Sequence, residues 1–222
     1  MQLKDLFEEP AAEQIAREVG IGSIKCWSGV YVDPMRPTLD TVRIDDIAHS
    51  LSLVCRYGGH CNDHYSVAQH CIEVAAYIEH LGGTAFTSMM GLLHDAEEAY
   101  FGDMPSPLKK HYPDYKRHGE YMRGFVMDKY IPGWRDVPRW YMEMVHQADQ
   151  DMYQIERMSF SAPYDEAFTT IGNKYGWGVV NAKACKEVEA EYLRWFAALG
   201  REDRIPVEGR GAVSPKSYAE GY

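Results

Sequence analysis

The sequence has no apolar run long enough to cross a membrane, no CxxC pair and no excess of positive charge. A membrane-spanning helix needs about 20 mostly apolar residues, so we expect none in this chain. The N-terminus, MQLKDLFEEP, is acidic from Asp5 onward and does not look like a secretory signal. The five cysteines are odd in number, which favours reduced thiols in a cytoplasmic protein over a disulfide framework.

The charge balance also argues against two classes of partner. Lys and Arg number 23 against 33 Asp and Glu, for a formal net charge of −10. A net anion is poorly suited to wrapping nucleic acid or lying on an anionic membrane. A small anionic substrate needs only a local cluster of cations or a metal, so that class remains open.

The apolar pattern predicts one mainly helical domain. Ser66 followed by Gln69 fits a capping box, and residues 25–44 suggest a short β-hairpin or an extended excursion. The fold class we expect is therefore all-α, with a short hairpin near the N-terminus, one domain over residues 1–200 and a peripheral tail at 201–222. Residues 103–113 contain three prolines and are expected to form a loop. Helices are predicted over about 9–19, from Asp45 to before Gly58, and over 67–81, 85–100, 114–130, 138–160 and 182–199.

The strongest chemical signal is His94-Asp95 inside the otherwise apolar stretch GLLHDAEEAY. An imidazole and a carboxylate are costly in an apolar helix unless something pairs with them, and a divalent metal would do so. His70 on the preceding helix and Asp149 on a later one could meet them, as in metal sites built inside helical bundles. This mixed set of ligands suits Mn, Fe, Co, Ni or Zn. The alternative is a hydrogen-bonded core histidine beside solvated aspartates.

The order His70, His94-Asp95, Asp149 resembles the H…HD…D signature of the HD-domain metal-dependent phosphohydrolases. The stretch HDAEEAYFGDMPSPLK (94–109) is similar to the 5′-deoxynucleotidase branch, and the QAD around Asp149 also resembles that branch. The stretch 46–70 looks like bacterial and phage HD hydrolases, including phage dATP triphosphohydrolases. The resemblance covers about residues 25–160. It departs from the nucleotidase branch at Tyr57, where that branch tends to have Trp after the Arg.

The resemblance implies a role for each matching residue. One divalent transition metal per chain would bind His70, His94, Asp95 and Asp149. It would activate water and neutralise phosphoryl oxygens. The remaining expected site residues are Glu98 as general acid or base, Asp103 for the attacking water or a sugar hydroxyl, Arg56 and Lys109 as phosphate clamps, Tyr57 and Trp27 for base stacking, and His60 and His64 near the phosphate.

The expected activity is hydrolysis of 5′-(deoxy)nucleotides to the deoxynucleoside. Two versions compete, a dNMP 5′-nucleotidase and a dATP-leaning dNTP triphosphohydrolase, and the number of cations around the site should separate them. Two other readings of the scaffold are a catalytically silent nucleotide sensor and a di-iron oxygenase, which needs two additional His ligands from His111, His118 or His146. Family resemblance also implies a homo-oligomer in a bacterial or phage-infected cytosol.

Overall fold

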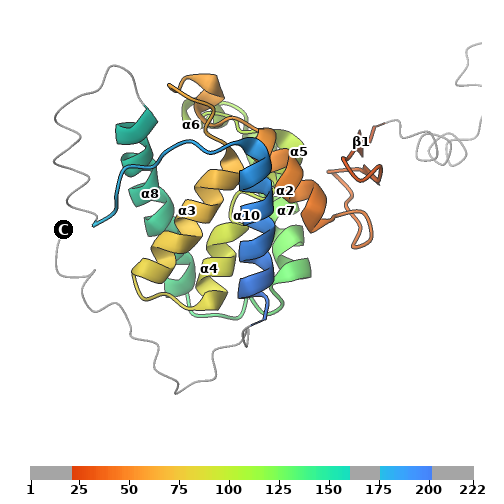
Figure 1. Ribbon diagram of the computed structural model, residues 1–222. Helices are drawn as coiled ribbons and strands as arrows, with labels where there is room; N and C mark the ends of the chain where they lie inside the picture. Colours follow the sequence, from red (N-terminus) through yellow and green to blue (C-terminus); the bar gives the residue numbers. More distant parts are fainter. Residues whose placement is uncertain (1–21, 161–175, 202–222) are drawn as a thin grey trace, which may run out of the picture.

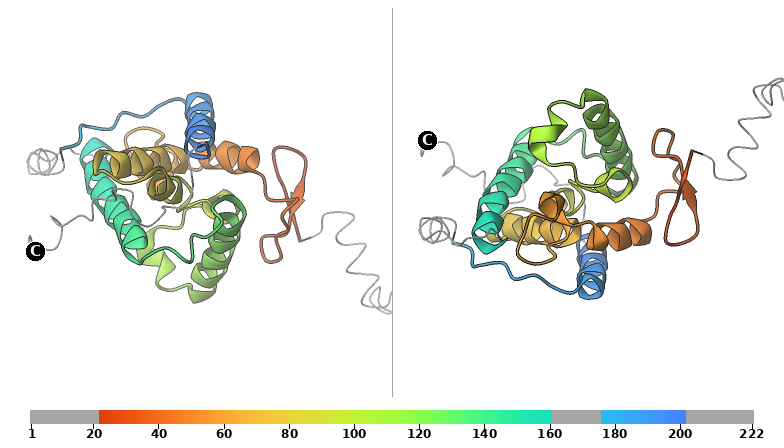
Figure 2. Two further views of the ribbon diagram at one scale, coloured as in Figure 1. Left: turned by 90° about the horizontal axis from the view of Figure 1, so that it is seen from below. Right: turned by 90° about the horizontal axis from the view of Figure 1, so that it is seen from above.

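The computed structural model describes residues 22–160 and 176–201, which form a mainly helical body with a small hairpin (Figure 1). The hairpin consists of β1 (Ile24–Lys25) and β2 (Tyr31–Val32), which pair antiparallel with Ile24 opposite Val32. Figure 2 shows the hairpin at one side of the helical body. The expected fold class, all-α with a short hairpin near the N-terminus, is therefore confirmed.

The central element is α3, which packs against α2, α4, α8 and α10 (Figure 1). Its apolar stripe of Val67, Cys71, Val74 and Ile78 is fully buried. The helices are α2 (Ile44–Leu53), α3 (Val67–His80), α4 (Ala85–Leu92), α5 (Glu98–Phe101), α6 (Ser106–Lys109), α7 (Pro113–Tyr130), α8 (Trp140–Phe160) and α10 (Cys185–Leu199), with a 3-10 turn η2 (Arg56–Gly59).

The start of α3 follows the sequence prediction in part. The Ser66 hydroxyl accepts a hydrogen bond from the Gln69 backbone N–H at 3.2 Å, which satisfies one of the free N–H groups of the first turn. The Gln69 side chain does not complete a capping box. It contacts the backbone of Asn181 and Lys183 instead, and so ties the segment before α10 to α3.

The structure corrects the predicted end of α2, which stops at Leu53 and not before Gly58. The following residues take extended conformations and bond to the segment that precedes α3. The Val67 N–H donates to the Val54 carbonyl at 3.0 Å, and the Arg56 N–H donates to the Tyr65 carbonyl at 2.8 Å. These bonds end the helix early and project residues 55–65 as a loop beside α3.

The predicted helix over residues 85–100 is also interrupted, because α4 ends at Leu92 and α5 begins at Glu98. The His94 side chain donates from Nδ1 to the Gly91 carbonyl at 2.7 Å. A continuing α-helix would use that carbonyl for the Asp95 N–H. A third correction concerns residues 103–113, where the one-turn helix α6 lies within the predicted loop and tolerates Pro107 in its first turn.

The remaining elements agree with the sequence within a few residues. Helices α7, α8 and α10 lie where periodicity predicted them. The helix expected over residues 9–19, and all but the first residue of the tail expected over 201–222, lie outside the described residues. Within the described part of the chain, no helix combines the length and apolar character needed to cross a bilayer.

The cap of α3 can be tested by substitution. We expect Ser66→Ala to lower the free energy of unfolding by about 1 kcal/mol, because the Gln69 N–H loses its partner. Urea denaturation followed by circular dichroism measures the change. Ser23→Ala, just before β1, is the matched control and should change stability by less. Equal stability of the two variants would contradict a capping role for Ser66.

Candidate metal centre

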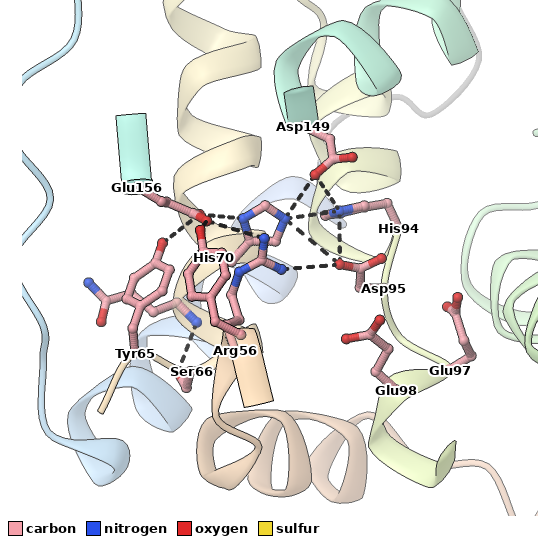
Figure 3. Close-up of polar contacts among 12 residues, drawn as sticks. Arg56, Tyr65, Ser66, His70, His94, Asp95, Glu97, Glu98, Asp149 and Glu156 are labelled. Carbon is pink, nitrogen blue, oxygen red and sulfur yellow. Dashed lines mark hydrogen bonds and ion pairs between the residues drawn. The ribbon is translucent and has the colours of Figure 1, made fainter. Parts of the chain in front are cut away.

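Four side chains from three segments point toward one another at the centre of the fold (Figure 3). His70 comes from α3, His94 and Asp95 come from the turn between α4 and α5, and Asp149 comes from α8. The His70 Nε2 atom lies 3.2 Å from both His94 Nε2 and Asp149 Oδ1. The Asp95 Oδ2 atom lies 3.2 Å from His94 Nε2 and 3.8 Å from His70 Nε2.

The two imidazoles are held in the tautomer that a metal requires. The Nδ1 atom of His94 contacts the Gly91 carbonyl, which can only accept a hydrogen bond. The Nδ1 atom of His70 contacts the buried carboxylate of Glu156. Both Nδ1 atoms therefore carry the proton, and both Nε2 lone pairs face the centre. Metal-binding histidines in proteins are usually oriented in this way.

This arrangement fits a single cation. His70, His94 and Asp95 each offer a ligand atom within 4.8 Å of the others, so the group could hold a metal ion. Ligand atoms about 2.1 Å from one ion lie about 3 to 3.5 Å apart, close to the spacings found here. Asp149 Oδ1 is 3.7 Å from His94 Nε2, in range to act as a fourth ligand.

The electrostatics of the cluster favour positive charge at its centre. Burial works against ionisation of every member. The carboxylates nevertheless raise the pKa of His94 well above its usual value, and Asp95 is the largest contributor. The imidazoles in turn lower the pKa values of Asp95 and Asp149. The lowered pKa values keep the two carboxylates ionised. A divalent ion can then take the place of the protons that the two imidazoles would otherwise bind at Nε2.

A cavity of about 360 Å³ opens beside the cluster, and its lining includes both predicted catalytic residues and half of the predicted substrate residues. Asp95 and Asp149 form the wall that faces the candidate metal site. Its lining also includes Arg56, Tyr57, Glu98, Asp103, Pro105, Pro107, Lys109, Gln150 and Tyr153. The structure therefore brings five of the predicted catalytic and substrate residues to one space.

Glu98 and Lys109 form an ion pair in the wall of this cavity, with Lys109 Nζ donating to Glu98 Oε1 at 2.8 Å. Glu98 is 2% exposed, and its Oε2 atom has no hydrogen-bond partner among the described residues. Burial, Asp95 and Asp103 together raise the pKa of Glu98 well above its usual value, although Lys109 opposes them. A carboxyl group in this setting holds its proton to higher pH than a solvated one, which favours a role as general acid.

Arg56 connects the cavity to a buried carboxylate behind His70. Its Nη2 atom lies 3.2 Å from Glu156 Oε2, and its Nη1 atom lies 3.7 Å from Asp95 Oδ2. Glu156 also accepts hydrogen bonds from the hydroxyls of Tyr57 at 2.6 Å and Tyr65 at 2.9 Å. Burial would raise the pKa of Glu156, but Arg56 and His70 outweigh it and lower the pKa to about 2.

Three of the predicted substrate residues lie away from the cavity. Trp27 is 70% exposed in the hairpin region and stacks on His49 with ring centroids 4.4 Å apart. His64 contacts the Leu53 carbonyl through Nε2 at 3.3 Å, and His60 is an exposed residue at the end of η2. None of the three is in the lining of the 360 Å³ cavity.

The sequence prediction missed two buried glutamates. Glu156 lies seven residues after Asp149, two turns along α8, and that spacing could have placed it on the same face. Glu97 pairs with Arg123 Nη1 at 3.2 Å, and burial, aided by Asp95, raises its pKa to about 7 although Arg123 opposes the rise. Arg123 also lines a second cavity of about 410 Å³, largely apolar, that shares Asp95 and Asp149 with the first.

Comparison with known proteins gives relatives without a named activity. The uncharacterized protein YfdR of Escherichia coli K12 is 38% identical over 123 residues, which are 55% of this chain and 66% of YfdR. An uncharacterized protein of Rhodobacter capsulatus is 37% identical over 86 residues, 37% of this chain and 44% of that protein. The chain thus spans less than two thirds of either relative. No protein-family model matches the chain.

The contact between Glu156 and His70 predicts a role in metal binding. We expect Glu156→Gln to weaken Mn²⁺ or Co²⁺ binding about 10- to 100-fold, because the amide no longer fixes the His70 tautomer as firmly. Isothermal titration calorimetry measures the affinity. Glu143→Gln, an exposed position on the same helix, is the matched control. Unchanged affinity in Glu156→Gln would show that His70 is oriented without this carboxylate.

Proposed function

We propose that this protein is a metal-dependent 5′-nucleotidase of the HD type that hydrolyses deoxynucleoside monophosphates to the deoxynucleoside and orthophosphate. The observation that carries the proposal is the convergence of two tautomer-fixed imidazoles and two carboxylates beside a cavity that contains Arg56, Lys109 and Glu98. A cavity of about 360 Å³ is in the range of small-molecule sites. The preference for deoxynucleotides rests on the resemblance of residues 94–109.

The charges in the cavity support a monophosphate over a triphosphate. Its wall has two cations, Arg56 and Lys109, and each already pairs with a glutamate. A triphosphate carries more negative charge and would need further cations. Lys110 lines a neighbouring cavity, Arg117 pairs with Asp114 at the surface, and His111 is exposed. None of these three is in the lining of the metal-side cavity.

The side chains of the cavity can divide the reaction among them. The metal, when bound, supplies a Lewis acid for the phosphoryl oxygens and lowers the pKa of water. Arg56 and Lys109 hold the phosphate, and Asp103 orients the attacking water or a sugar hydroxyl. Water forms a new bond to phosphorus, the bond to the 5′-oxygen breaks, and protonated Glu98 gives its proton to that oxygen. One proton of the attacking water stays on the phosphate, and the other returns to the Glu98 carboxylate.

The structure supports a di-iron oxygenase less well than a hydrolase with one metal ion. A di-iron oxygenase needs a second group of ligands. Among the described residues, His70, His94 and Asp95 form the one such group that could hold a metal ion. His111 and His146 are exposed.

Product analysis tests the proposal most directly. We expect the metal-loaded protein, incubated with separate dNMPs and dNTPs, to release orthophosphate from the monophosphates. Chromatography of the nucleosides together with a phosphate assay identifies the products. Asp95→Ala is the negative control, because it deletes a ligand and should lose both bound metal and turnover.

Two other outcomes would replace the proposal. Deoxynucleoside plus tripolyphosphate from dNTPs, with dATP preferred, would make the protein a triphosphohydrolase. Tight nucleotide binding without turnover on any substrate would instead favour a sensor.

The role of Glu98 can be separated from metal binding. We expect Glu98→Gln to retain the metal but to lose about 10²- to 10⁴-fold in kcat, because the amide cannot transfer a proton. Steady-state kinetics and metal analysis of the same preparation measure both quantities. Glu120→Gln, at an exposed position on α7, is the control. Loss of metal in Glu98→Gln would assign Glu98 to the metal site itself.

A further inference from the structure

Two cysteines lie next to each other at the base of the loop that follows α2. The Sγ atoms of Cys55 and Cys61 are 3.7 Å apart, and both thiols are free and partly buried. A disulfide bond is about 2.05 Å long, so the sulfur atoms need to approach by less than the length of one such bond. The two residues are close in sequence, so bridging them closes only a short loop.

The loop between these cysteines presents a predicted substrate residue. It contains Arg56, and the Cys61 thiol lies 4.0 Å from the Arg56 carbonyl. Tyr57 has φ 60°, a left-handed conformation that is uncommon outside glycine, and Gly58 and Gly59 also have positive φ. The backbone N–H of Arg56 is fixed to the Tyr65 carbonyl. The loop is therefore tightly folded around the position of Arg56.

We propose that Cys55 and Cys61 are a reversible dithiol–disulfide pair, oxidised by a low-molecular-weight disulfide, and that their oxidation weakens nucleotide binding by displacing Arg56. The first part stands on the sulfur geometry alone. The second part rests on the proposed function, because it takes Arg56 as a phosphate-binding residue.

The oxidation is an ordinary pair of thiol–disulfide exchange steps. One cysteine thiolate attacks the S–S bond of oxidised glutathione, which forms a mixed disulfide and releases one glutathione thiolate. The second cysteine thiolate attacks the protein sulfur of that mixed disulfide, which forms the Cys55–Cys61 bond and releases a second glutathione thiolate. The two protein thiols lose two electrons and two protons, and the protons go to the two glutathione thiolates.

The other cysteines are less suited to this reaction. Cys71 is buried in the core, and Cys26 contacts the carbonyl of Ile24 in the hairpin. Cys185 lies 3.7 Å from His64 Nδ1. Burial, aided by the bond from Cys55, raises the pKa of Cys61, so little thiolate is present at neutral pH. Mildly alkaline buffer should therefore speed the oxidation.

Oxidation should displace Arg56 because the loop from Cys55 to Cys61 is short and tightly folded. When the sulfur atoms approach, the backbone at Arg56 must adjust, because Cys55 directly precedes Arg56 and the Cys61 thiol lies against the Arg56 carbonyl. Arg56 and Tyr57 are the two side chains of that loop that contact Glu156 and line the cavity, and Arg56 is the cation of the pair. We therefore expect oxidation to raise the KM for a nucleotide several-fold with a smaller effect on kcat.

The test oxidises the full-length protein with oxidised glutathione at mildly alkaline pH. Thiols are then counted after denaturation, and the disulfide is located by peptide mapping under non-reducing conditions. The chain has five cysteines, so one disulfide should leave three free thiols. KM and kcat are measured before oxidation, after oxidation and after treatment with dithiothreitol. Cys61→Ser should keep all its thiols free and show no change in KM. Cys26→Ser, the control, should still form the bond.

The outcomes separate the two parts of the proposal. Five free thiols after oxidation, a stable mixed disulfide, or a disulfide that involves Cys185 would overturn the assignment of the pair. A mapped Cys55–Cys61 disulfide with unchanged KM would overturn the coupling to Arg56. Absence of nucleotidase activity in the reduced protein would count against the proposed function, whereas the thiol count and the peptide map would still decide the site of oxidation.

Discussion

The carboxylate of Glu156 is the constraint on which the centre of this fold depends. A fully buried carboxylate is costly unless its oxygens are all used. Here Tyr57 and Tyr65 donate hydroxyl hydrogens to it, Arg56 lies against it and His70 contacts it through Nδ1. These contacts join α8 to α3 and to the loop at η2. One charge therefore fixes the orientation of an imidazole in the candidate metal site and the position of the Arg56 guanidinium in the cavity wall.

The interruption between α4 and α5 is the second feature that shapes the site. Successive side chains of a regular α-helix point about 100° apart, so adjacent His and Asp residues do not readily face one point. In this structure the Gly91 carbonyl bonds to the His94 side chain, and the chain continues in tight turns to Glu98. The break lets Asp95 Oδ2 lie 3.2 Å from His94 Nε2. The imidazole thus helps to create the local geometry that coordination of a metal by His94 and Asp95 would require.

The sequence predicted most of the helices and the members of the cluster, but not the features that fix their geometry. Periodic apolar residues located α3, α7, α8 and α10, because those helices bury one stripe each. The pair His94-Asp95 stood out because polar residues are rare in such an apolar segment. The end of α2 and the break after α4 depend on partners that periodicity does not reveal, namely Tyr65, Val67 and the His94 side chain. Glu156 was not among the predicted site residues, because a glutamate beside Arg157 has no sequence feature that marks it as buried, other than its spacing of seven residues from Asp149.

Arg56 shows how one side chain can serve both the buried network and a substrate. Its Nη2 atom is committed to Glu156 at 3.2 Å, whereas Nη1 is 3.7 Å from Asp95, which is beyond hydrogen-bond length. Its buried Nε atom has no hydrogen-bond partner among the described residues. A guanidinium has five donors in a planar fork, so binding a phosphate need not break the contact with Glu156. Under the proposed function, the phosphate of the substrate would accept hydrogen bonds from the Arg56 donors that Glu156 does not use. The contact between Glu156 and His70, and so the orientation of His70, would stay intact.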